Sequence, residues 1–370
     1  MTNKNSTYKR LGDYIEQRRE KNKGFDVPIR GVSREGFIPP KQQDADVNLY
    51  NVFYKNDFVF NPARMELNSI ALNEDLEQGI CSSLYEIFYI KDTNVLDPLY
   101  LNLLIKTDHF TRFCEFVGWG SVREYCRFAD ISEYYIEVPP IEEQHKIVSH
   151  FNAIRTRISN NKQTIAKLEE AAQALYRKMF VDDVDVENLP EGWRMGTIEE
   201  ISEKIVAGTI PKYDDTSSYM VLGQKCNKNG ILDLNLCKRH IPKDNCLFLQ
   251  KKDILVNSTG DGTLGRVGQI WFEPEKLAFD SNMTLVRPLN RYSEYLGCVL
   301  LNKQDYFVQI SQGSTNQTRL YCSMIKPVPL IIPSDIILYD FSKAIKPMKE
   351  HVYLLYKENE KLKEMLSMMA

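Results

Sequence analysis

Two long segments of the chain place apolar residues at spacings that alternate between four and three. The residues are Ile147, Phe151, Ile154, Ile158, Asn161, Ile165, Leu168, Ala172, Leu175 and Met179, and then Phe341, Ile345, Met348, Val352, Leu355, Asn359, Leu362, Leu366 and Met369. This spacing is typical of helices that pack together in a left-handed coiled coil. Neither segment contains glycine, and only Pro347 could kink the second. The pattern therefore predicts two long helices, over residues 141–180 and 334–370.

The chain also contains an internal duplication. An offset of 194 relates the two helical series, and it also relates Pro139 to Pro333, Ile131 to Ile325 and Gly36 to Gly230. Residues 57–61 match 253–257 at an offset of 196, and Gly120-Ser121 matches Gly313-Ser314 at 193. Because these matches occur in order along the chain, they indicate one unit written twice.

The duplication predicts a chain built as globular unit, long helix, globular unit and long helix. The expected boundaries are 1–140 for the first globular unit, 141–180 for the central helix, 181–189 for an acidic linker, 190–333 for the second globular unit and 334–370 for the C-terminal helix. Short strand-like runs, such as 58–60, 86–90, 253–256 and 284–286, mix with helical stretches such as 99–113. The expected fold class is therefore mixed α+β, and no regular strand–helix alternation suggests a doubly wound sheet.

Each helical series contains one asparagine, and these two residues predict how the helices pair. In an antiparallel pair Asn161 faces Asn359, Phe151 faces Met369 and Met179 faces Phe341. A parallel pair would place each asparagine opposite an apolar residue. Because a buried asparagine commonly fixes register at some cost in stability, we expect an antiparallel coiled coil with neighbouring asparagines. Such a pair would relate the two globular units by a pseudo-two-fold axis.

Composition limits the classes of partner. The chain has 47 Lys and Arg against 50 Asp and Glu. Residues 1–140 have 17 basic against 21 acidic residues, and residues 181–333, which include the acidic linker, have 17 against 19, so neither segment has a basic excess. This balance argues against a general polyanion binder but leaves room for a narrow basic cleft. The eight cysteines include no Cys-x-x-Cys pair, so reduced thiols are favoured over a zinc site at Cys237 and His240. No apolar signal or membrane-length run is found, which predicts a cytoplasmic protein.

Motifs for chemistry within the chain lack the necessary context. Residues 260–265 match G-x-G-x-x-G, but strand-like sequence follows instead of a helix, so a glycine-rich turn is the better interpretation. Residues 61–64 resemble an adenine methyltransferase loop, but they offer no aromatic side chain to stack a flipped base. We therefore expect no catalytic residue, metal ligand or cofactor site in this chain.

Two similar units related by a two-fold axis could bind duplex DNA, which can itself present two half-sites. The alternative is a pair of interaction modules held apart by the helices.

The chain resembles the specificity subunit of Type I restriction–modification enzymes over nearly its whole length. The resemblance lies in four segments: Asp253–Gly268 (DILVNSTGDGTLGRVG), Phe60–Arg64 (FNPAR) with Asn68–Ile70, Pro139–Ile147 (PPIEEQHKI) and Gly208–Pro211 (GTIP). The second unit departs from the family pattern because Pro333 is followed by Ser-Asp-Ile instead of the Pro-Ile-Glu-Glu-Gln run.

The resemblance implies a division of labour. Each globular unit would be a target recognition domain that reads one half of a bipartite sequence in double-stranded DNA. The helices would set the spacer and bind two methyltransferase subunits, which hold S-adenosylmethionine and methylate adenine at N6. Restriction subunits that use ATP and Mg²⁺ to translocate and cut DNA would complete the assembly. This chain itself would be non-catalytic.

Candidate DNA-contacting residues follow the matched strands. They are polar or basic, as base edges and phosphates require: Arg64, Asn68, Ser69, Arg123, Lys225, Ser258, Thr259, Thr263, Arg266, Asn316, Thr318 and Arg319. For the matched Ser, Asn and Gly residues an alternative stays open, because residues shared by both units could simply build a common turn.

Three other interpretations also stay open at this point. The chain could serve a Type IIB-like system whose partner fuses nuclease and methylase. It could be a nucleotide- or methyl-donor-binding enzyme that uses the 260–265 loop. It could also be a coiled-coil adaptor without a DNA role.

Overall fold

The computed structural model describes residues 8–24, 26–40, 46–118, 125–182, 184–228, 230–313 and 318–369, with the side chain of Met369 excepted. The chain divides into two compact units. Unit 1 comprises Met1–Arg157 with Leu362–Ala370, and unit 2 comprises Ile158–Lys361. Both long helices therefore contribute residues to each unit.

The helices agree closely with the hydrophobic pattern. They are α1 (Pro98–Ile105), α2 (Asp108–Gly118), α3 (Phe128–Ile131), α4 (Ile141–Phe180), α5 (Ser293–Asn302), α6 (Gln304–Ile310), α7 (Cys322–Ile325) and α8 (Asp335–Met369). Short 3₁₀ turns are η1 (Leu11–Asp13), η2 (Val47–Leu49), η3 (Pro62–Leu67), η4 (Glu199–Ile201), η5 (Gln224–Cys226), η6 (Leu234–Leu236) and η7 (Asn290–Tyr292). α8 runs without interruption through Pro347, whereas the stretch expected to be helical at 99–113 is divided between α1 and α2.

Unit 1 is built around a four-stranded antiparallel sheet. Its strands are, in spatial order, β2 (Ile15–Arg18), β9 (Glu86–Ile90), β6 (Phe58–Phe60) and β7 (Ile70–Leu72). Smaller antiparallel pairs are β1 (Tyr8–Arg10) with β10 (Tyr135–Glu137), β3 (Gly31–Ser33) with β4 (Gly36–Ile38), and β5 (Asn51–Tyr54) with β8 (Gln78–Cys81).

Unit 2 repeats this plan. Its central antiparallel sheet has the order β12 (Ser202–Ala207), β21 (Met283–Pro288), β18 (Ile254–Asn257) and β19 (Val267–Gln269). A second sheet has the order β13 (Lys212–Tyr213), β17 (Lys238–Ile241), β14 (Met220–Leu222) and β20 (Leu277–Phe279). The remaining pairs are β11 (Arg194–Thr197) with β22 (Pro329–Ile332), and β15 (Asn227–Lys228) with β16 (Ile231–Leu232).

The duplication seen in the sequence is thus a duplication of topology. Strands β2, β9, β6 and β7 follow one another in space as β12, β21, β18 and β19 do. The outer strand pair β1–β10 of unit 1 corresponds to β11–β22 of unit 2. A short helix precedes the second strand of each pair: α3 precedes β10, and α7 precedes β22. Ile131 and Ile325, which lie 194 residues apart, are both fully buried at the end of that helix. The mixed α+β class and the repeated unit are therefore confirmed.

The central strands are buried because both faces of the sheet are covered. In unit 1, Phe58 and Phe60 point to a core that includes α1 and α2, while Val59 points to a core beneath β3 and β5. Alternate residues of a strand point to opposite faces, so a strand that is apolar at every position needs a layer on each side. β18 is buried at all four positions in the same way.

A buried carboxylate pairs with an arginine in each central sheet, and the two copies place the arginine on different strands. Asp57, just before β6, binds Arg18 of β2, while Asp253, just before β18, binds Arg287 of β21. The Arg18 Nε to Asp57 Oδ2 distance is 2.6 Å, and Arg287 holds Asp253 through two bonds of 2.8 Å. Burial raises the pKa of the Asp57 carboxyl, and Arg18 opposes this shift. The duplication has therefore retained the carboxylate while moving its arginine to another strand.

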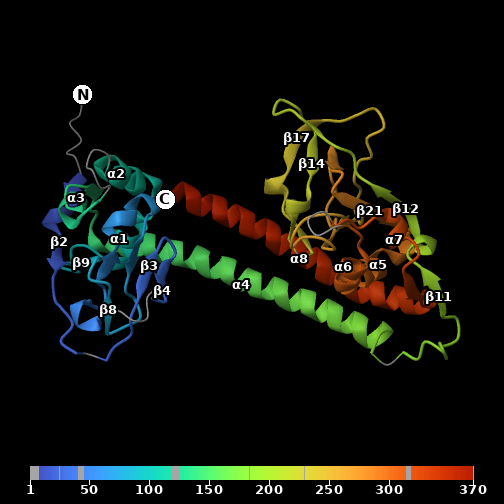
Figure 1. Ribbon diagram of the computed structural model, residues 1–370, viewed down its shortest axis with the longest axis horizontal. Coiled ribbons are helices and arrows are strands. Elements are labelled where there is room, and N and C mark those ends of the chain that lie inside the picture. The colour runs from blue at the N-terminus through green and yellow to red at the C-terminus, as the bar shows by residue number, and fades with distance from the viewer. Residues whose placement is uncertain are drawn as a thin grey trace. The chain divides into compact units, whose positions relative to one another are not determined.

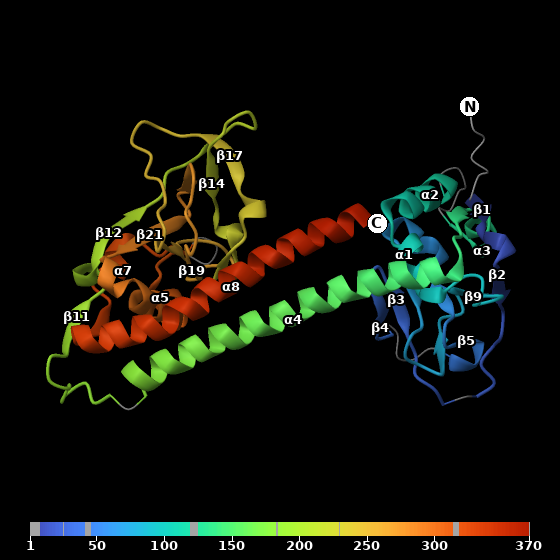
Figure 2. The ribbon, with the colours of Figure 1, turned by 180° about the vertical axis from the view of Figure 1, so that it is seen from behind.

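Within unit 2, α4 and α8 pack side by side and run in opposite directions, as Figures 1 and 2 show. Nδ2 of Asn161 donates to Oδ1 of Asn359 at 3.0 Å, and both residues are almost fully buried. Ile165 and Leu355 lie in one apolar cluster. The structure therefore places the asparagines as the antiparallel register predicts. The predicted contact of Phe151 with Met369 lies outside the described side chains.

The other predicted seam residues also lie on α4 and α8. Ile158, Val352 and Phe341 are buried, and Met179 packs against the core that contains Phe341. The remaining predicted seam positions are partly or largely buried: Phe151, Ile154, Leu168, Leu362 and Leu366. A buried ion pair between Glu169 and Lys349 also joins α4 to α8. The interface is thus apolar with polar contacts at the Glu169–Lys349 pair and at the asparagines, where Asn161 also donates to Glu358 at 2.9 Å.

The asparagine pair gives a stability prediction. Asn161→Leu leaves the Asn359 amide buried opposite an apolar side chain, so we expect a loss of about 1–3 kcal/mol in the free energy of unfolding. The double variant Asn161→Leu/Asn359→Leu removes both amides and should recover part of this loss, since the bond from Asn161 to Glu358 is lost in both variants. Urea unfolding measures both values, with Asn160→Leu on the exposed face as control. A double variant less stable than the single one would contradict the prediction.

Candidate nucleic-acid interface

Three of the candidate DNA-contacting residues are buried and already bonded within their unit. Asn68 adopts a left-handed conformation, with φ of 51°, and its amide donates to Ile105 O at 2.7 Å. Ser69 donates to Val32 O at 3.1 Å. Ser258 shares a hydrogen bond of 2.7 Å with Thr284. Since their polar groups are satisfied inside the protein, these residues build the loops that follow the central strands, which is the alternative that the sequence left open.

The loops after β6 and β18 are closed by equivalent backbone bonds. The amide of Asn61 donates to Ser69 O at 3.0 Å, and the amide of Asn257 donates to Arg266 O at 2.9 Å. In unit 1 the enclosed segment forms η3, whereas in unit 2 it is a glycine-rich turn with positive φ at Gly260, Gly262 and Gly265. Strand β19 follows this turn, so the glycine-turn interpretation of residues 260–265 is confirmed.

In unit 2 this turn meets two other segments of the chain. The side-chain amide of Asn257 donates to Gln224 O at 3.0 Å, and the backbone amide of Ser258 donates to Asn282 O at 2.8 Å. The Thr259 hydroxyl lies 3.0 Å from Oε1 of Gln224 and 3.0 Å from Oδ1 of Asn282. We call this junction of residues 223–226, 257–263 and 280–282 the three-segment site of unit 2.

The equivalent junction exists in unit 1. Residues 29–32 include the start of β3 in the β3–β4 hairpin, residues 61–64 follow β6, and residues 82–85 connect β8 to β9. These segments line a groove of about 350 Å³ that contains Arg30, Asn61, Arg64, Ser82 and Tyr85. Burial raises the pKa of the Tyr85 phenol, so it stays neutral at physiological pH. This junction is the three-segment site of unit 1, and its two arginines make it the cationic one of the pair.

Of the other predicted residues, Lys225 and Thr263 belong to the three-segment site of unit 2, and two arginines brace it. Lys225 is exposed beside Gln224. Arg266 donates to Gly262 O at 2.8 Å, and Arg319 donates to Ser281 O at 2.8 Å, so each holds one of the converging segments. Thr263 and Thr318 are partly exposed. Arg123 and Asn316 lie outside the described residues.

Asp280 fixes the turn that carries Asn282. The backbone amide of Asn282 donates to Oδ1 of Asp280 at 2.8 Å, and its side-chain amide lies 3.3 Å from Oδ2. Burial raises the pKa of the Asp280 carboxyl above its ordinary value. A side chain at Gly223 would come within 3.0 Å of this carboxylate, so glycine there lets two of the segments approach each other closely.

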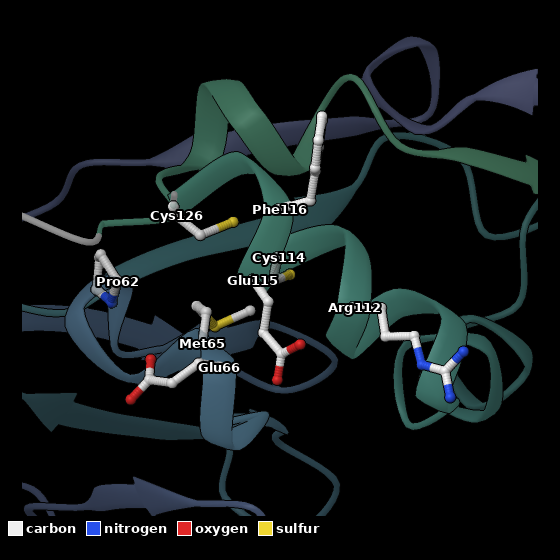
Figure 3. A pocket seen from close by; sticks show the side chains of 9 residues that line it. Pro62, Met65, Glu66, Arg112, Cys114, Glu115, Phe116 and Cys126 are labelled. Atoms are coloured by element: carbon white, nitrogen blue, oxygen red, sulfur yellow. The ribbon is translucent and has the colours of Figure 1, made fainter. Parts of the chain in front are cut away.

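Another cavity of unit 1, of about 410 Å³, lies between η3 and α2. Cys114 and Cys126 line its interior, and Glu66 and Glu115 stand on its edge with Arg112 to one side (Figure 3). Two carboxylates against one guanidinium make this edge a poor match for a phosphate backbone. The three-segment site is the better candidate for a nucleic acid.

Sequence reasoning missed Arg30, Gln224 and Asn282. The match of Gly36 with Gly230 pointed to the right region, because these glycines lie in the hairpins that Arg30 and Gln224 precede. Asn282 belongs to a turn between strands β20 and β21, which only the fold brings next to Thr259.

The cysteines and histidines form no metal-like cluster within the described residues. All eight cysteines are free thiols, and His240 is buried, which lowers its pKa. No helix in the described part of the chain has the length and hydropathy of a membrane span.

Comparison with known proteins agrees with this architecture. Residues 15–170 and 190–337 match the family model of the Type I restriction modification DNA specificity domain. The specificity subunit of Type I restriction enzyme MjaIX from Methanocaldococcus jannaschii is 22% identical over 273 residues, which cover 68% of this chain and 62% of that protein. The specificity subunit of Type I restriction enzyme HindI from Haemophilus influenzae is 23% identical over 147 residues, which cover 38% and 32%.

Solved structures share the fold. The S subunit of a Type I restriction–modification system from M. genitalium has a TM-score of 0.57 at 16% identity, with 100% of this chain and 95% of that chain covered. A chain from a structure describing complex assembly and conformational transition of the type I R-M system has a TM-score of 0.50 at 16% identity, with 98% and 95% covered.

The family model matches most of the chain in two successive copies. The chain therefore belongs to the Type I restriction–modification DNA specificity family. It spans less than two thirds of the length of the curated relatives it matches.

Proposed function

We propose that this chain selects the DNA target of a Type I restriction–modification complex in the cytoplasm. Each of its two units reads one half of a bipartite sequence in double-stranded DNA. The observation that carries this proposal is the repeated three-segment site, which is built on the same strands in both units but carries different side chains. Two sites of one design suit a duplex that presents two half-sites.

The partners follow from the family and from the helices. We place two methyltransferase subunits against the paired helices α4 and α8, where they supply S-adenosylmethionine and methylate adenine at N6. Restriction subunits that use ATP and Mg²⁺ join the same complex. The specificity subunits among the relatives are components of Type I restriction enzymes, in keeping with this assembly. In this scheme the chain contributes recognition and positioning but no catalysis.

The charge distribution predicts how tightly the chain holds DNA by itself. Each phosphate contact needs a cation, and affinity from such contacts falls steeply with salt. With 47 basic against 50 acidic residues, the chain offers only local cations such as Arg30, Arg64 and Lys225. Much of the phosphate contact would therefore come from the partner subunits, while this chain supplies the sequence preference.

The methylome of the host provides the test. We expect adenine methylation at one bipartite motif in cells that carry the gene, and its loss when the gene is deleted while the modification gene is kept. Single-molecule sequencing of the genome in both strains measures this. Retention of the motif after deletion would overturn the proposal, as would a methylated motif with a single continuous recognition sequence.

A further inference from the structure

The two three-segment sites share their backbone plan and differ in the side chains that they present. Residues that both copies retain, such as Asn61 and Asn257 at the ends of the central strands, hold the loops together. The side chains that choose a sequence should instead be unlike, because the two halves of a bipartite target differ. The segment that leads into the hairpin meets this criterion, with Arg30 in unit 1 and Gln224 in unit 2.

The surroundings of Gln224 leave its amide able to bind a ligand. The Thr259 hydroxyl has one proton and two amide oxygens at 3.0 Å, so it satisfies either Gln224 or Asn282 at a given time. Among the described residues, none accepts a hydrogen bond from Nε2 of Gln224. Gly260, with φ of 110°, supplies the space, since a Cβ there would lie 2.7 Å from Oε1 of Gln224. The Gln224 side chain is thus positioned by Thr259, and among the described residues its Nε2 group has no hydrogen-bond partner and can donate to a ligand.

Arg30 is held in a comparable way in unit 1. Its backbone amide donates to Ile80 O at 2.9 Å, which anchors the segment to strand β8. Its Nη1 donates to Ile29 O at 3.1 Å, so the remaining guanidinium donors stay available in the groove. Arg64 stands in the same groove on the segment after β6 and adds a second positive charge.

We propose that Gln224 and Arg30 are the specificity-determining residues at equivalent places in the two units, and that they read an adenine and a guanine respectively. A glutamine amide pairs with N6 and N7 of adenine, and an arginine fork pairs with O6 and N7 of guanine in the major groove. Lys225 and Arg64, beside them, contact phosphate. The inference rests on the proposed function, since it names the bases that each unit recognises.

The test compares variants in the complete complex with its modification subunits, using adenine methylation of a randomised bipartite DNA library. Gln224→Ala should make one adenine position in one half-site degenerate, with preference for that base falling about 5- to 150-fold. Gln224→Glu is isosteric and can only accept, so it should shift the preference at that position from adenine to cytosine. Arg30→Ala should relax one guanine position in the other half-site, and Arg30→Lys should do so in part because it lacks the planar fork.

Lys225→Ala is the matched control, since it removes a neighbouring exposed cation. It should lower methylation of all library members to a similar degree and leave the motif unchanged. Melting temperatures within about 2 °C of the parent chain, as expected for surface changes, show that the variants are folded.

Several results would overturn the inference. An unchanged motif for folded Gln224→Glu and Arg30→Ala would do so, as would a uniform loss of methylation like that of Lys225→Ala, or changes in both half-sites from one variant. Failure of the proposed function is separate from these results, because then the parent complex itself would methylate no bipartite motif.

Discussion

Replacing residues 190–333 with the corresponding region of another specificity subunit is expected to change one half of the methylated DNA sequence and to leave the other half unchanged. Each unit contains its own central sheet and its own three-segment site, so recognition by one does not need residues of the other. Each mismatched base pair costs about 1–3 kcal/mol, so several changed positions should shift the preference between the old and new half-sites by more than a thousandfold.

Methylome sequencing of cells that express the hybrid chain with the modification subunits measures this change. The hybrid keeps α4 and α8, and with them Asn161 and Asn359, so assembly should be preserved. The reciprocal replacement of residues 1–140 should alter the opposite half-site. A hybrid in which both half-sites change would contradict independent recognition by the two units.

The substitution Arg287→Met is expected to lower the free energy of unfolding by about 3–5 kcal/mol. Arg287 holds the carboxylate of Asp253 through two hydrogen bonds of 2.8 Å, and the aspartate is 1% exposed. Removing the arginine leaves a buried carboxylate without its cation, which is far more costly than the loss of an exposed pair. The same carboxylate also accepts a hydrogen bond from the backbone N–H of Gln250, so the turn before β18 should loosen.

The control for this prediction is Arg194→Met, which removes an ion pair to Glu200 on the surface of the same unit. Both of its side chains are well exposed, so solvent screens the pair and the expected loss is much smaller than that for Arg287→Met. Urea or thermal unfolding measured at one pH near 7 compares the two variants. A loss below 1 kcal/mol for Arg287→Met would show that the buried pair contributes little to stability.

The sequence predicted the two long helices well because their apolar residues repeat at a regular spacing. The four–three spacing defines α4 over the expected 141–180 and α8 to within a residue at each end. The single asparagine in each series was enough to select the antiparallel register, since only that register lets the two amides pair. The strand-like runs at 58–60, 86–90 and 284–286 lie in β6, β9 and β21, and the run at 253–256 overlaps β18.

The candidate site was predicted less completely. Arg64 and Thr259 lie in the three-segment sites, as part of the proposed contact residues. Asn68, Ser69 and Ser258 instead support the loops from inside. Residues that repeat in both units are easy to find in the sequence, but they build the structure that the two copies have in common. Recognition of different DNA bases depends on the residues that differ between the copies.

The sequence by itself determined the duplication, the two helices and their pairing, and the family to which the chain belongs, because these properties depend on local periodicity and ordered motifs. Only the tertiary structure determined which polar side chains are exposed in the loops and which are buried. Gln224, Thr259 and Asn282 are separated by more than twenty residues from one another. Only the folding of the chain, which pairs β18 with β21 and places the end of β14 near them, brings the Thr259 hydroxyl within hydrogen-bonding distance of the other two. Burial is a property of packing between distant segments, so a serine in a turn and a serine on a recognition surface look alike until the chain is folded.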